Sequence, residues 1–240
     1  GMIEDGDKIA VGISGGKDSL TLLYALAHLR IFYPKKFELC AITIDMGFEG
    51  ADFSAVSALC EQLGVEYRII PTQISKIIFD VRKESNPCSL CAKMRRGAIH
   101  SSAVELGCNK VALGHHFDDV VETFMLNLFF EGRLGCFRPV TYLSRTGITL
   151  IRPMIYMPEK DIRYFASKAE LPIIKSPCPA DGNTEREEMK QLIAKLDREN
   201  KGLRYRIFGA IQRGEIDGFK ECGKMDGMKA YDNDVLPYEE

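Results

Sequence analysis

The feature that most constrains the fold of this chain is an apolar, β-branched run that ends in a glycine-rich turn. Residues 8–14 read KIAVGIS, and the turn SGGKDS at 14–19 leads into a helical pattern that ends near Phe32. A run of this kind is typical of a buried parallel strand. The chain repeats the design with KVALGHH at 110–116, which precedes an apolar helical stretch at 118–130.

Strand and helix patterns alternate along most of the chain. We predict further strands at 39–46, 65–70 and 148–152, and further helices at 51–64, 88–106, 158–169, 184–199 and 203–213. This alternation predicts an α/β fold with a doubly wound, mostly parallel sheet, which binds its ligand at the carboxyl ends of the strands. Both glycine turns fall at such strand ends, so we expect them to share one site.

The 240 residues suffice for one large domain with an added lobe. We predict an ATP-binding α/β domain at 1–175, a cysteine loop with a small helical extension at 176–215, and a loosely ordered tail at 216–240. No apolar run is long enough to cross a bilayer, and no signal segment opens the sequence. We therefore expect a cytoplasmic protein that does not contact a membrane.

The turn at 14–19 has the composition of an anion-binding loop. Its glycines let the backbone approach an anion, and N–H groups at the start of the next helix point toward that anion. Lys17 adds a positive charge, whereas Asp18 suits a magnesium ion. A Walker loop is excluded because Val11 stands in place of its first glycine, and the dinucleotide motif because Ser14 replaces its second. The plain alternative is a serine-capped turn without a ligand.

The second glycine turn begins G-H-H-x-D-D-x-x-E-T, from Gly114 to Thr123. An acidic pair at the start of a helix is a favourable N-terminal cap, which is the interpretation that needs no ligand. In the functional interpretation, Asp119 or Asp118 lies near a magnesium ion on the phosphates of ATP. A zinc site at His115 and His116 is excluded because no third ligand follows at helical spacing.

The eight cysteines are unevenly spaced, which in a chain of this length favours thiols or metal ligands over a disulfide framework. Cys88 and Cys91 form a C-x-x-C pair at the predicted start of a helix, where the helix N-terminus is expected to lower the thiol pKa. Such a pair is half of a zinc site, a redox dithiol or a chance pair. We assign no role to the cysteines in ordinary surroundings, which are Cys40, Cys60, Cys108 and Cys136.

Three motifs resemble known families. SGGKDS resembles the signature of the PP-loop ATP-pyrophosphatases, which cleave ATP to AMP and pyrophosphate on an adenine nucleotide alpha hydrolase-like sheet. The G-H-H-x-D-D-x-x-E-T motif resembles the one shared by tRNA lysidine synthetases and the tRNA 2-thiocytidine (TtcA-type) thiolases. The run C-S-L-C-x-x-x-R-R-G at 88–97 resembles the corresponding segment of the thiolases. It distinguishes them from the lysidine synthetases, which lack the cysteine pair.

The resemblance implies the residues of an ATP site. The phosphates would be held by Ser14, Gly15, Gly16, Lys17, Asp18 and Ser19. The nucleoside pocket would be bounded by Ile13, Asp45, Gly114 and His115. Lys17, Asp18 and Asp119 would be the catalytic residues, with Asp18 and Asp119 as ligands of the magnesium ion.

The resemblance also implies a [4Fe–4S] cluster, because Cys178 matches the place of the family's third cysteine after Cys88 and Cys91. Three cysteines leave the fourth iron open, and an open coordination position can carry hydrosulfide. Zinc is the alternative, with Cys222 as the obvious fourth ligand, and a closed site of that kind would be structural.

The net charge of −2 gives no global sign of nucleic-acid binding, so RNA would need a local basic patch. Lys93, Arg95 and Arg96 follow the C-x-x-C pair, and Arg152 lies in I-R-P-M, which resembles an R-P-L segment near the family's catalytic cleft. The plainer interpretation of each basic group is a solvated helix face. A base of an anticodon loop is single-stranded and can be splayed into a pocket.

The resemblance, which covers roughly residues 3–213, implies an ATP-dependent tRNA cytidine 2-thiolase or a close relative that acts on another tRNA base. It would adenylate the C2 oxygen of an anticodon-loop cytidine, release pyrophosphate, and replace AMP with sulfur from the cysteine-bound cluster. The expected partners are tRNA and a sulfur donor such as a cysteine desulfurase, and a second subunit in a homodimer is one source of further RNA contacts. Two alternatives stay open. A lysidine-synthetase-like ligase with a structural zinc would not need the three cysteines, and a non-catalytic tRNA-binding module would not consume ATP.

Overall fold

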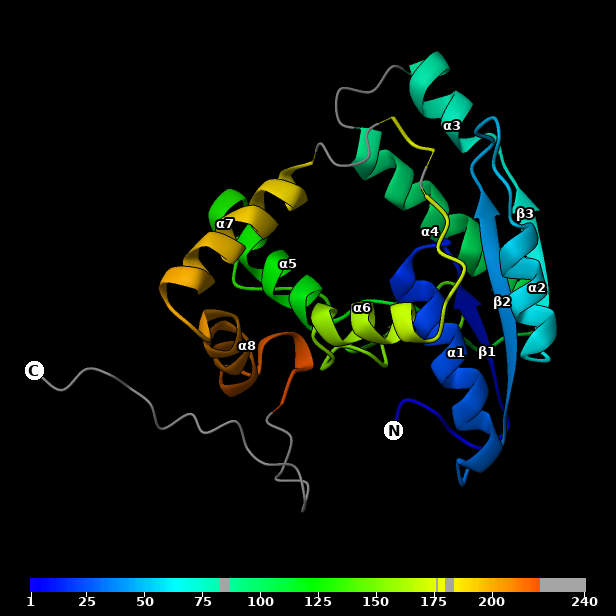
Figure 1. The fold of residues 1–240 in the computed structure, drawn as a ribbon, viewed down its shortest axis with the longest axis horizontal. Helices are drawn as coiled ribbons and strands as arrows, with labels where there is room; N and C mark the ends of the chain where they lie inside the picture. Colours follow the sequence, from blue (N-terminus) through cyan, green and yellow to red (C-terminus); the bar gives the residue numbers. More distant parts are fainter. Residues whose placement is uncertain (83–86, 176, 180–183, 221–240) are drawn as a thin grey trace, which may run out of the picture.

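The computed structural model describes residues 1–82, 87–175, 177–179 and 184–220, and its centre is a six-stranded sheet (Figure 1). The strand order is β3-β2-β1-β4-β6-β5. All neighbours are parallel except β5, which pairs antiparallel with β6 at the edge. The strands are β1 (Asp7–Gly12), β2 (Phe37–Asp45), β3 (Glu66–Pro71), β4 (Lys110–Ala112), β5 (Val140–Leu143) and β6 (Ile148–Ile151).

Helices connect the strands and continue beyond the last one. They are α1 (Lys17–Phe32), α2 (Ser54–Gln62), α3 (Ile74–Lys76), the π-helical η1 (Ile77–Arg82), α4 (Pro87–Glu105), α5 (Phe117–Phe130), α6 (Glu159–Lys168), α7 (Glu185–Glu199), α8 (Leu203–Arg213) and the 3-10 helix η2 (Ile216–Gly218). Among the described residues, no helix is both long and apolar enough to cross a membrane.

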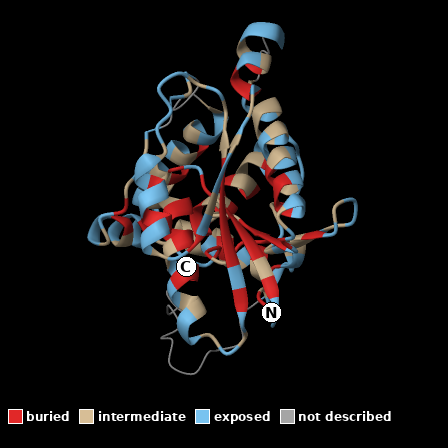
Figure 2. Ribbon diagram, turned by 90° about the vertical axis from the view of Figure 1, so that its right-hand side faces the viewer, coloured by how far each residue is buried: buried red, intermediate tan, exposed pale blue. Residues whose placement is uncertain are grey.

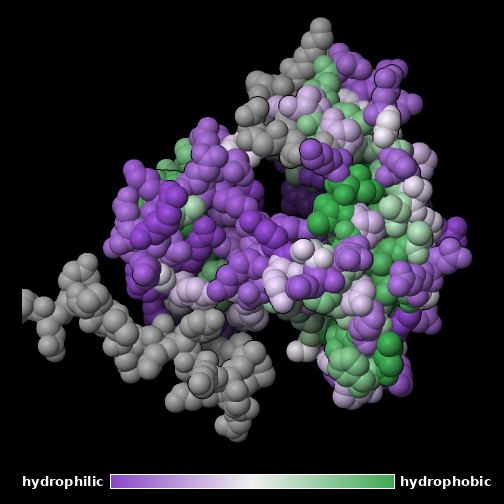
Figure 3. Space-filling model, in the orientation of Figure 1, coloured by the Kyte–Doolittle hydropathy of each residue, from purple (hydrophilic) through white to green (hydrophobic). Residues whose placement is uncertain are grey.

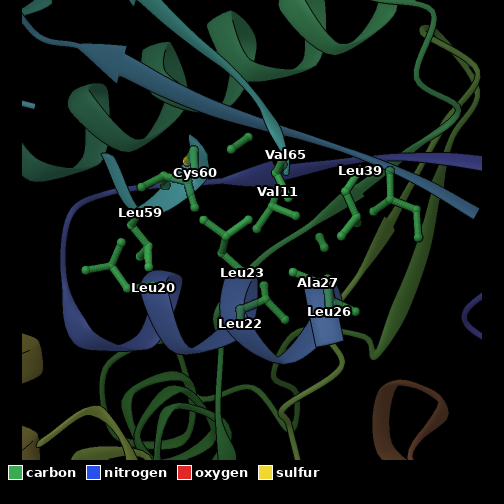
Figure 4. Packing of buried hydrophobic residues seen from close by; sticks show 14 of the residues in the cluster. Val11, Leu20, Leu22, Leu23, Leu26, Ala27, Leu39, Leu59, Cys60 and Val65 are labelled. Carbon is green, nitrogen blue, oxygen red and sulfur yellow. The ribbon is translucent and has the colours of Figure 1, made fainter. Parts of the chain in front are cut away.

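Alternate residues of the central strands pack into two apolar cores, one on each face of the sheet. Val11 of β1 belongs to the core on one face, which includes residues of α1, α2 and α6, and Figure 4 shows it beside side chains of α1 and α2. Its neighbour Ala10 faces the opposite side and packs with Ile99 and Ala103 of α4. Because both faces are covered, β1, β2, β4 and β6 are buried along most of their length (Figure 2), as expected of a parallel sheet, whereas the edge strands β3 and β5 have no buried residue.

A third apolar core joins α5 to the segment that follows the sheet. Phe117 of α5, Ile193 of α7 and Phe208 of α8 are buried in it together. In Figure 1, α7 and α8 lie on the far side of α5 from strands β1 to β3. The buried Asp118 adds a polar link, because it accepts a hydrogen bond from the Glu159 backbone N–H at 2.7 Å and pairs with Arg204 of α8. The C-terminal helices are therefore fixed to the domain that carries the sheet.

The structure confirms the predicted α/β class and five of the six strands. The edge strand β5 was not predicted, because it is short and its side chains are half-buried or exposed. The segment at 74–82, which forms α3 and η1, was also missed. The prediction of a loosely ordered tail is wrong for its first residues, since η2 forms and Phe219 has 0% exposure. The rest of the tail, including Cys222, lies outside the described residues, and the three-part domain boundaries stay a prediction.

Phe219 offers a test of this third core. Replacing it with alanine removes a fully buried ring, so we expect Phe219→Ala to lower the free energy of unfolding by about 3–5 kcal/mol. Phe130→Ala is the matched control, because that ring is 63% exposed and its loss is expected to cost less than about 1 kcal/mol. Urea unfolding measures both. Equal stability of Phe219→Ala and wild type would show that residues after α8 do not belong to the core.

Candidate functional site

The site is built where β1 and β4 end side by side and their connections diverge. β4 leads into Gly114, whose backbone touches the first turn of α1. A Cβ atom at Gly114 would lie 3.0 Å from the carbonyl carbon of Asp18 and 3.1 Å from the Ser19 nitrogen. A side chain at this position would be crowded against the helix backbone, so glycine favours the approach, and the contact brings the two glycine turns together as predicted from their positions on the strands.

Hydroxyl groups and the segment that follows α6 hold the loop at 14–19 in place. The Ser14 N–H donates to Ser19 Oγ at 3.1 Å, and Ser19 Oγ donates to the Gly16 carbonyl at 3.0 Å. Gly15 has a φ of +81° and its carbonyl accepts from the Ile174 N–H at 2.9 Å. Because α1 begins at Lys17, its first N–H groups lack intrahelical acceptors and are available to an anion.

A buried carboxylate organises the lysines around this loop. Glu159 of α6 has a side chain that is 9% exposed, and it lies 3.0 Å from Lys17 Nζ and 2.9 Å from Lys190 Nζ. Burial alone would raise the pKa of Glu159, but the two ammonium groups outweigh it and lower the pKa to about 2. Burial likewise opposes the charge of Lys17, yet Asp18 and Glu159 raise its pKa. Both partners of the pair are therefore charged at neutral pH.

His116, Asp118 and Asp119 at the start of α5 make different contacts. His116 caps the helix: its Nδ1 accepts from the Asp119 N–H at 3.4 Å, and the His116 N–H donates to Asp119 Oδ2 at 3.0 Å. The helix-cap interpretation of this motif is thus confirmed for Asp119, which caps α5 together with His116. Asp118 faces α6 and α8, whereas Asp119 keeps 21% exposure and opens toward the loop, with Arg186 3.4 Å from its Oδ1.

A polar cavity of about 340 Å³ lies between the loop, α5, α6 and α7. Lys17, Asp18 and Asp119, the three residues predicted to be catalytic, all line it. Asp18 Oδ1 is buried and has no hydrogen bond within the described part of the chain, although Lys17 Nζ is 3.1 Å away. A buried carboxylate oxygen that accepts no hydrogen bond from the described residues, at the edge of a polar cavity, fits a magnesium ion, which prefers carboxylate oxygens.

A larger cavity of about 810 Å³ adjoins the polar one. Figure 3 shows the molecule hollowed at its centre, between the hydrophilic surface over α7 and a more apolar surface toward the sheet. The predicted ATP-site residues that line this cavity are Ile13, Ser14, Asp18, Ser19, Asp45, Gly114 and His115. Gly15 and Gly16 line neither cavity and contribute the loop backbone. Burial, with help from Arg152 and Arg186, lowers the pKa of His115 to about 3, so its ring is neutral.

The three predicted metal ligands line the same large cavity. Cys88 and Cys91 lie on the first turns of α4, and Cys178 lies in the loop after α6. Burial raises the pKa of Cys91; Arg95 opposes this, while the nearby Cys178 and Cys88 add to it. The expected lowering by the helix start is therefore wrong for Cys91, because burial outweighs it.

The thiols are a chemically suitable donor set for an iron–sulfur cluster, since three cysteines line the same cavity. Across residues 1–82, 87–175, 177–179 and 184–220, however, no three His, Cys, Asp or Glu side chains already surround a common metal position. A bound cluster would require the side chains to close around it. Cys222, the fourth ligand of the zinc alternative, lies outside the described residues.

The predicted RNA-binding residues divide into two groups. Arg95, Arg96 and Arg152 line the large cavity, whereas Lys93 is exposed and does not. Arg152 is 8% exposed, donates to the Arg138 carbonyl at 2.6 Å, and lies 5.0 Å from the centre of the Phe137 ring. Burial lowers its pKa to about 10, which leaves it charged at neutral pH. Arg152 therefore also has a structural role beside the cavity.

Sequence reasoning missed four residues of the site, which are Phe137, Glu159, Arg186 and Lys190. Three of them lie in ordinary-looking charged helical stretches, where a solvated face is the simplest interpretation. The helical spacing of the apolar residues in 184–199 indicates which face of α7 is buried. It does not indicate that Arg186 and Lys190 reach α5 and α6, because that depends on tertiary packing.

The charge network at Glu159 predicts a pH dependence of stability. The pKa of Glu159 is lower in the folded state than the ordinary 4.5, so its contribution is complete above pH 4.5 and is lost as the pH falls toward 2. We expect Glu159→Gln to cost about 2–3 kcal/mol at pH 7 and about half as much at pH 3. Urea unfolding at both values measures this, with the exposed Glu61→Gln as control. If Glu159→Gln lowered the free energy of unfolding equally at pH 7 and pH 3, the lowered pKa of Glu159 would be contradicted.

Comparisons with known proteins agree with this geometry. A family model described as PP-loop domain matches residues 3–196. A tRNA-cytidine(32) 2-sulfurtransferase of Geobacter sulfurreducens is 40% identical over 214 residues, which span 88% of this chain and 83% of the relative. Its namesake in Syntrophotalea carbinolica is 42% identical over 213 residues, which span 88% of this chain and 82% of the relative.

A solved structure is also similar over most of the chain. It is the U34-tRNA thiolase NcsA from Methanococcus maripaludis with its [4Fe–4S] cluster. The TM-score is 0.73 at 30% identity, with 88% of this chain and 72% of that chain covered. These matches confirm the resemblance predicted from the three motifs. The chain belongs to the PP-loop family and, within it, to the family of the tRNA-cytidine(32) 2-sulfurtransferases.

Proposed function

We propose that the protein is an ATP-dependent tRNA sulfurtransferase that replaces the C2 oxygen of an anticodon-loop cytidine with sulfur. The observation that carries this proposal is that the phosphate loop and three cysteines line one cavity of about 810 Å³. A base placed in this cavity can face ATP on one side and a sulfur source on the other. The relatives named tRNA-cytidine(32) 2-sulfurtransferase support tRNA as the substrate and cytidine as its target base.

The first half of the reaction is adenylation of the base. The loop at 14–19 binds the phosphates through its N–H groups and hydroxyls, and Lys17 supplies a charge that Glu159 holds in position. Asp18 and Asp119 are the residues that would hold a magnesium ion on those phosphates. The C2 oxygen then attacks the α-phosphorus and pyrophosphate leaves, so that a poor leaving group becomes AMP. Adenosine would lie between Ile13, Asp45, Gly114 and His115, at the strand ends.

The second half is replacement of AMP by sulfur at the same carbon. Cys88, Cys91 and Cys178 are the residues that would hold a [4Fe–4S] cluster on the cavity wall. When bound through three cysteines, such a cluster has one open iron and supplies the sulfur. Arg95 lies close enough to Cys91 to favour its thiolate form, which is the form that binds metal. A sulfur donor such as a cysteine desulfurase would provide the sulfur atom for each turnover.

Recognition of the RNA follows from the cations around the cavity. Arg95, Arg96 and Arg152 line it, and the exposed Lys93 extends the positive surface of α4. These side chains are placed to neutralise phosphates on either side of a base that has been splayed out of its loop. Phosphate contacts of this kind position the RNA but carry no sequence information. The base itself would be read inside the cavity.

The proposal predicts that the two half-reactions separate in a cysteine variant. Under anaerobic conditions with a reconstituted cluster, tRNA, ATP and sulfide, we expect wild type to form AMP and 2-thiocytidine. Cys91→Ser is expected to lose thiolation at least about 100-fold while AMP formation persists, because Cys91 does not line the phosphate cavity. Nucleoside mass spectrometry and AMP quantification measure the two products. Cys60→Ala, which alters a buried thiol on α2, is the control.

Two outcomes would contradict the proposal. If Cys91→Ser retained full product formation with an amine in place of sulfide, a lysidine-synthetase-like ligase would be the better assignment. If wild type bound tRNA without forming AMP, the loop would be vestigial. Stoichiometric zinc without iron after anaerobic purification would also overturn the cluster, leaving a structural metal site.

A further inference from the structure

α7 is held in place from its apolar side. Met189 and Ile193 are 3% and 2% exposed and pack into the core that contains Phe117 of α5. Arg186 and Lys190 are four residues apart, so they project from the same side of the helix. Because the apolar contacts fix how α7 is rotated, they also fix these two cations against the polar cavity, which both of them line.

Arg186 reaches across to α5, where it pairs with two carboxylates and remains partly exposed to the cavity. Its Nη2 donates to Thr123 Oγ1 at 3.1 Å, while Nη1 lies 3.4 Å from Asp119 Oδ1 and 3.7 Å from Glu122 Oε2. The side chain remains 46% exposed. A guanidinium has five N–H donors, so these contacts orient it while leaving donors for a ligand.

Among the residues that the structure describes, three line both cavities, namely Asp18, Thr184 and Arg186, and Arg186 is the cation of the three. The described lining of the smaller cavity includes five carboxylates and three basic side chains, so it suits the terminal phosphates of ATP together with a magnesium ion. The larger one, at the ends of β1 and β2, suits a nucleoside and a second base. Residues shared by the two therefore mark the boundary, which is where a nucleotide spanning both cavities would place its α-phosphate.

We propose that Arg186 is a catalytic residue that contacts the α-phosphate during adenylyl transfer. This inference rests on the proposed function and adds a residue to it. As the acceptor oxygen bonds to the α-phosphorus, the bond from that phosphorus to the bridging oxygen breaks and its electrons leave with pyrophosphate. The guanidinium stabilises the charge on the non-bridging oxygens through two N–H donors and transfers no proton.

Lys190 provides an internal comparison on the same helix. It lines the polar cavity but not the larger one. Its Nζ lies 2.9 Å from the Glu159 carboxylate, which also pairs with Lys17. At this position Lys190 would contact the terminal phosphates. It would bind them equally strongly in the ATP complex and in the transition state. The two cations of α7 should therefore differ in their kinetic effect, since only Arg186 meets the phosphorus at which bonds change.

The test measures AMP formation and ATP affinity separately, each with and without tRNA. The variants are Arg186→Gln, Arg186→Lys and Lys190→Gln, and Lys195→Gln on an exposed position of α7 is the control. We expect Arg186→Gln to lower the rate at saturating ATP about 100-fold or more, with less than a threefold change in Kd. Arg186→Lys should recover only part of the rate, because an ammonium lacks the planar fork. Lys190→Gln should instead raise the Kd for ATP with less than about a threefold change in rate.

The result that would overturn the inference is an Arg186→Gln enzyme with the wild-type rate at saturating ATP. The inference would also be overturned if Lys195→Gln lowered the rate of AMP formation as much as Arg186→Gln does. The same holds if Arg186→Gln lowered the melting temperature enough to explain its lower rate. Failure of the proposed function gives a different pattern. In that case wild type would cleave ATP to AMP without stimulation by tRNA, while the cleavage still depended on Arg186.

Discussion

The contact between Gly114 and the first turn of α1 is the constraint on which the rest of the site depends. The segment after β4 packs closely against Asp18 and Ser19, where a Cβ atom at position 114 would lie only 3.0 Å from the Asp18 carbonyl carbon. This contact sets the distance between the phosphate loop and the histidine that caps α5. His116 Nε2 consequently lies 3.8 Å from Asp18 Oδ1 and 3.5 Å from Asp119 Oδ2, so the acids predicted to hold magnesium flank one buried ring.

From that junction the site extends in two directions. Toward α6 and α7 it is a charged cavity, in which Glu159 balances Lys17 and Lys190. Toward β2 and α4 it is a larger space bounded by strand ends and three thiols. The polar part has the character of a phosphate site, and the larger part has room for a nucleoside and a base. A sulfurtransferase that first adenylates its target needs this arrangement, because ATP and the sulfur source must reach the same carbon.

Sequence reasoning predicted what is encoded locally. The β-branched run before 14–19, the glycine that follows β4 and the C-x-x-C pair each carry their signal within about ten residues, and each lies where it was expected. Tertiary effects were not predicted. Lys190 and Glu159 are 31 positions apart and Arg186 and Asp119 are 67 apart, so their pairing depends on how α7 packs. The pKa of Cys91 shows the same limit, since burial outweighs the local effect of the helix start.

The central claim is that ATP activates the oxygen of the target base. The most direct measurement uses a tRNA whose target cytidine carries ¹⁸O at C2, with ATP, sulfide and the anaerobically reconstituted protein, followed by mass spectrometry of the AMP. If the base oxygen attacks the α-phosphorus, one ¹⁸O per thiolated base appears in the AMP phosphate. AMP that contains solvent oxygen, with ¹⁸O retained in the tRNA or released to water, would contradict the account.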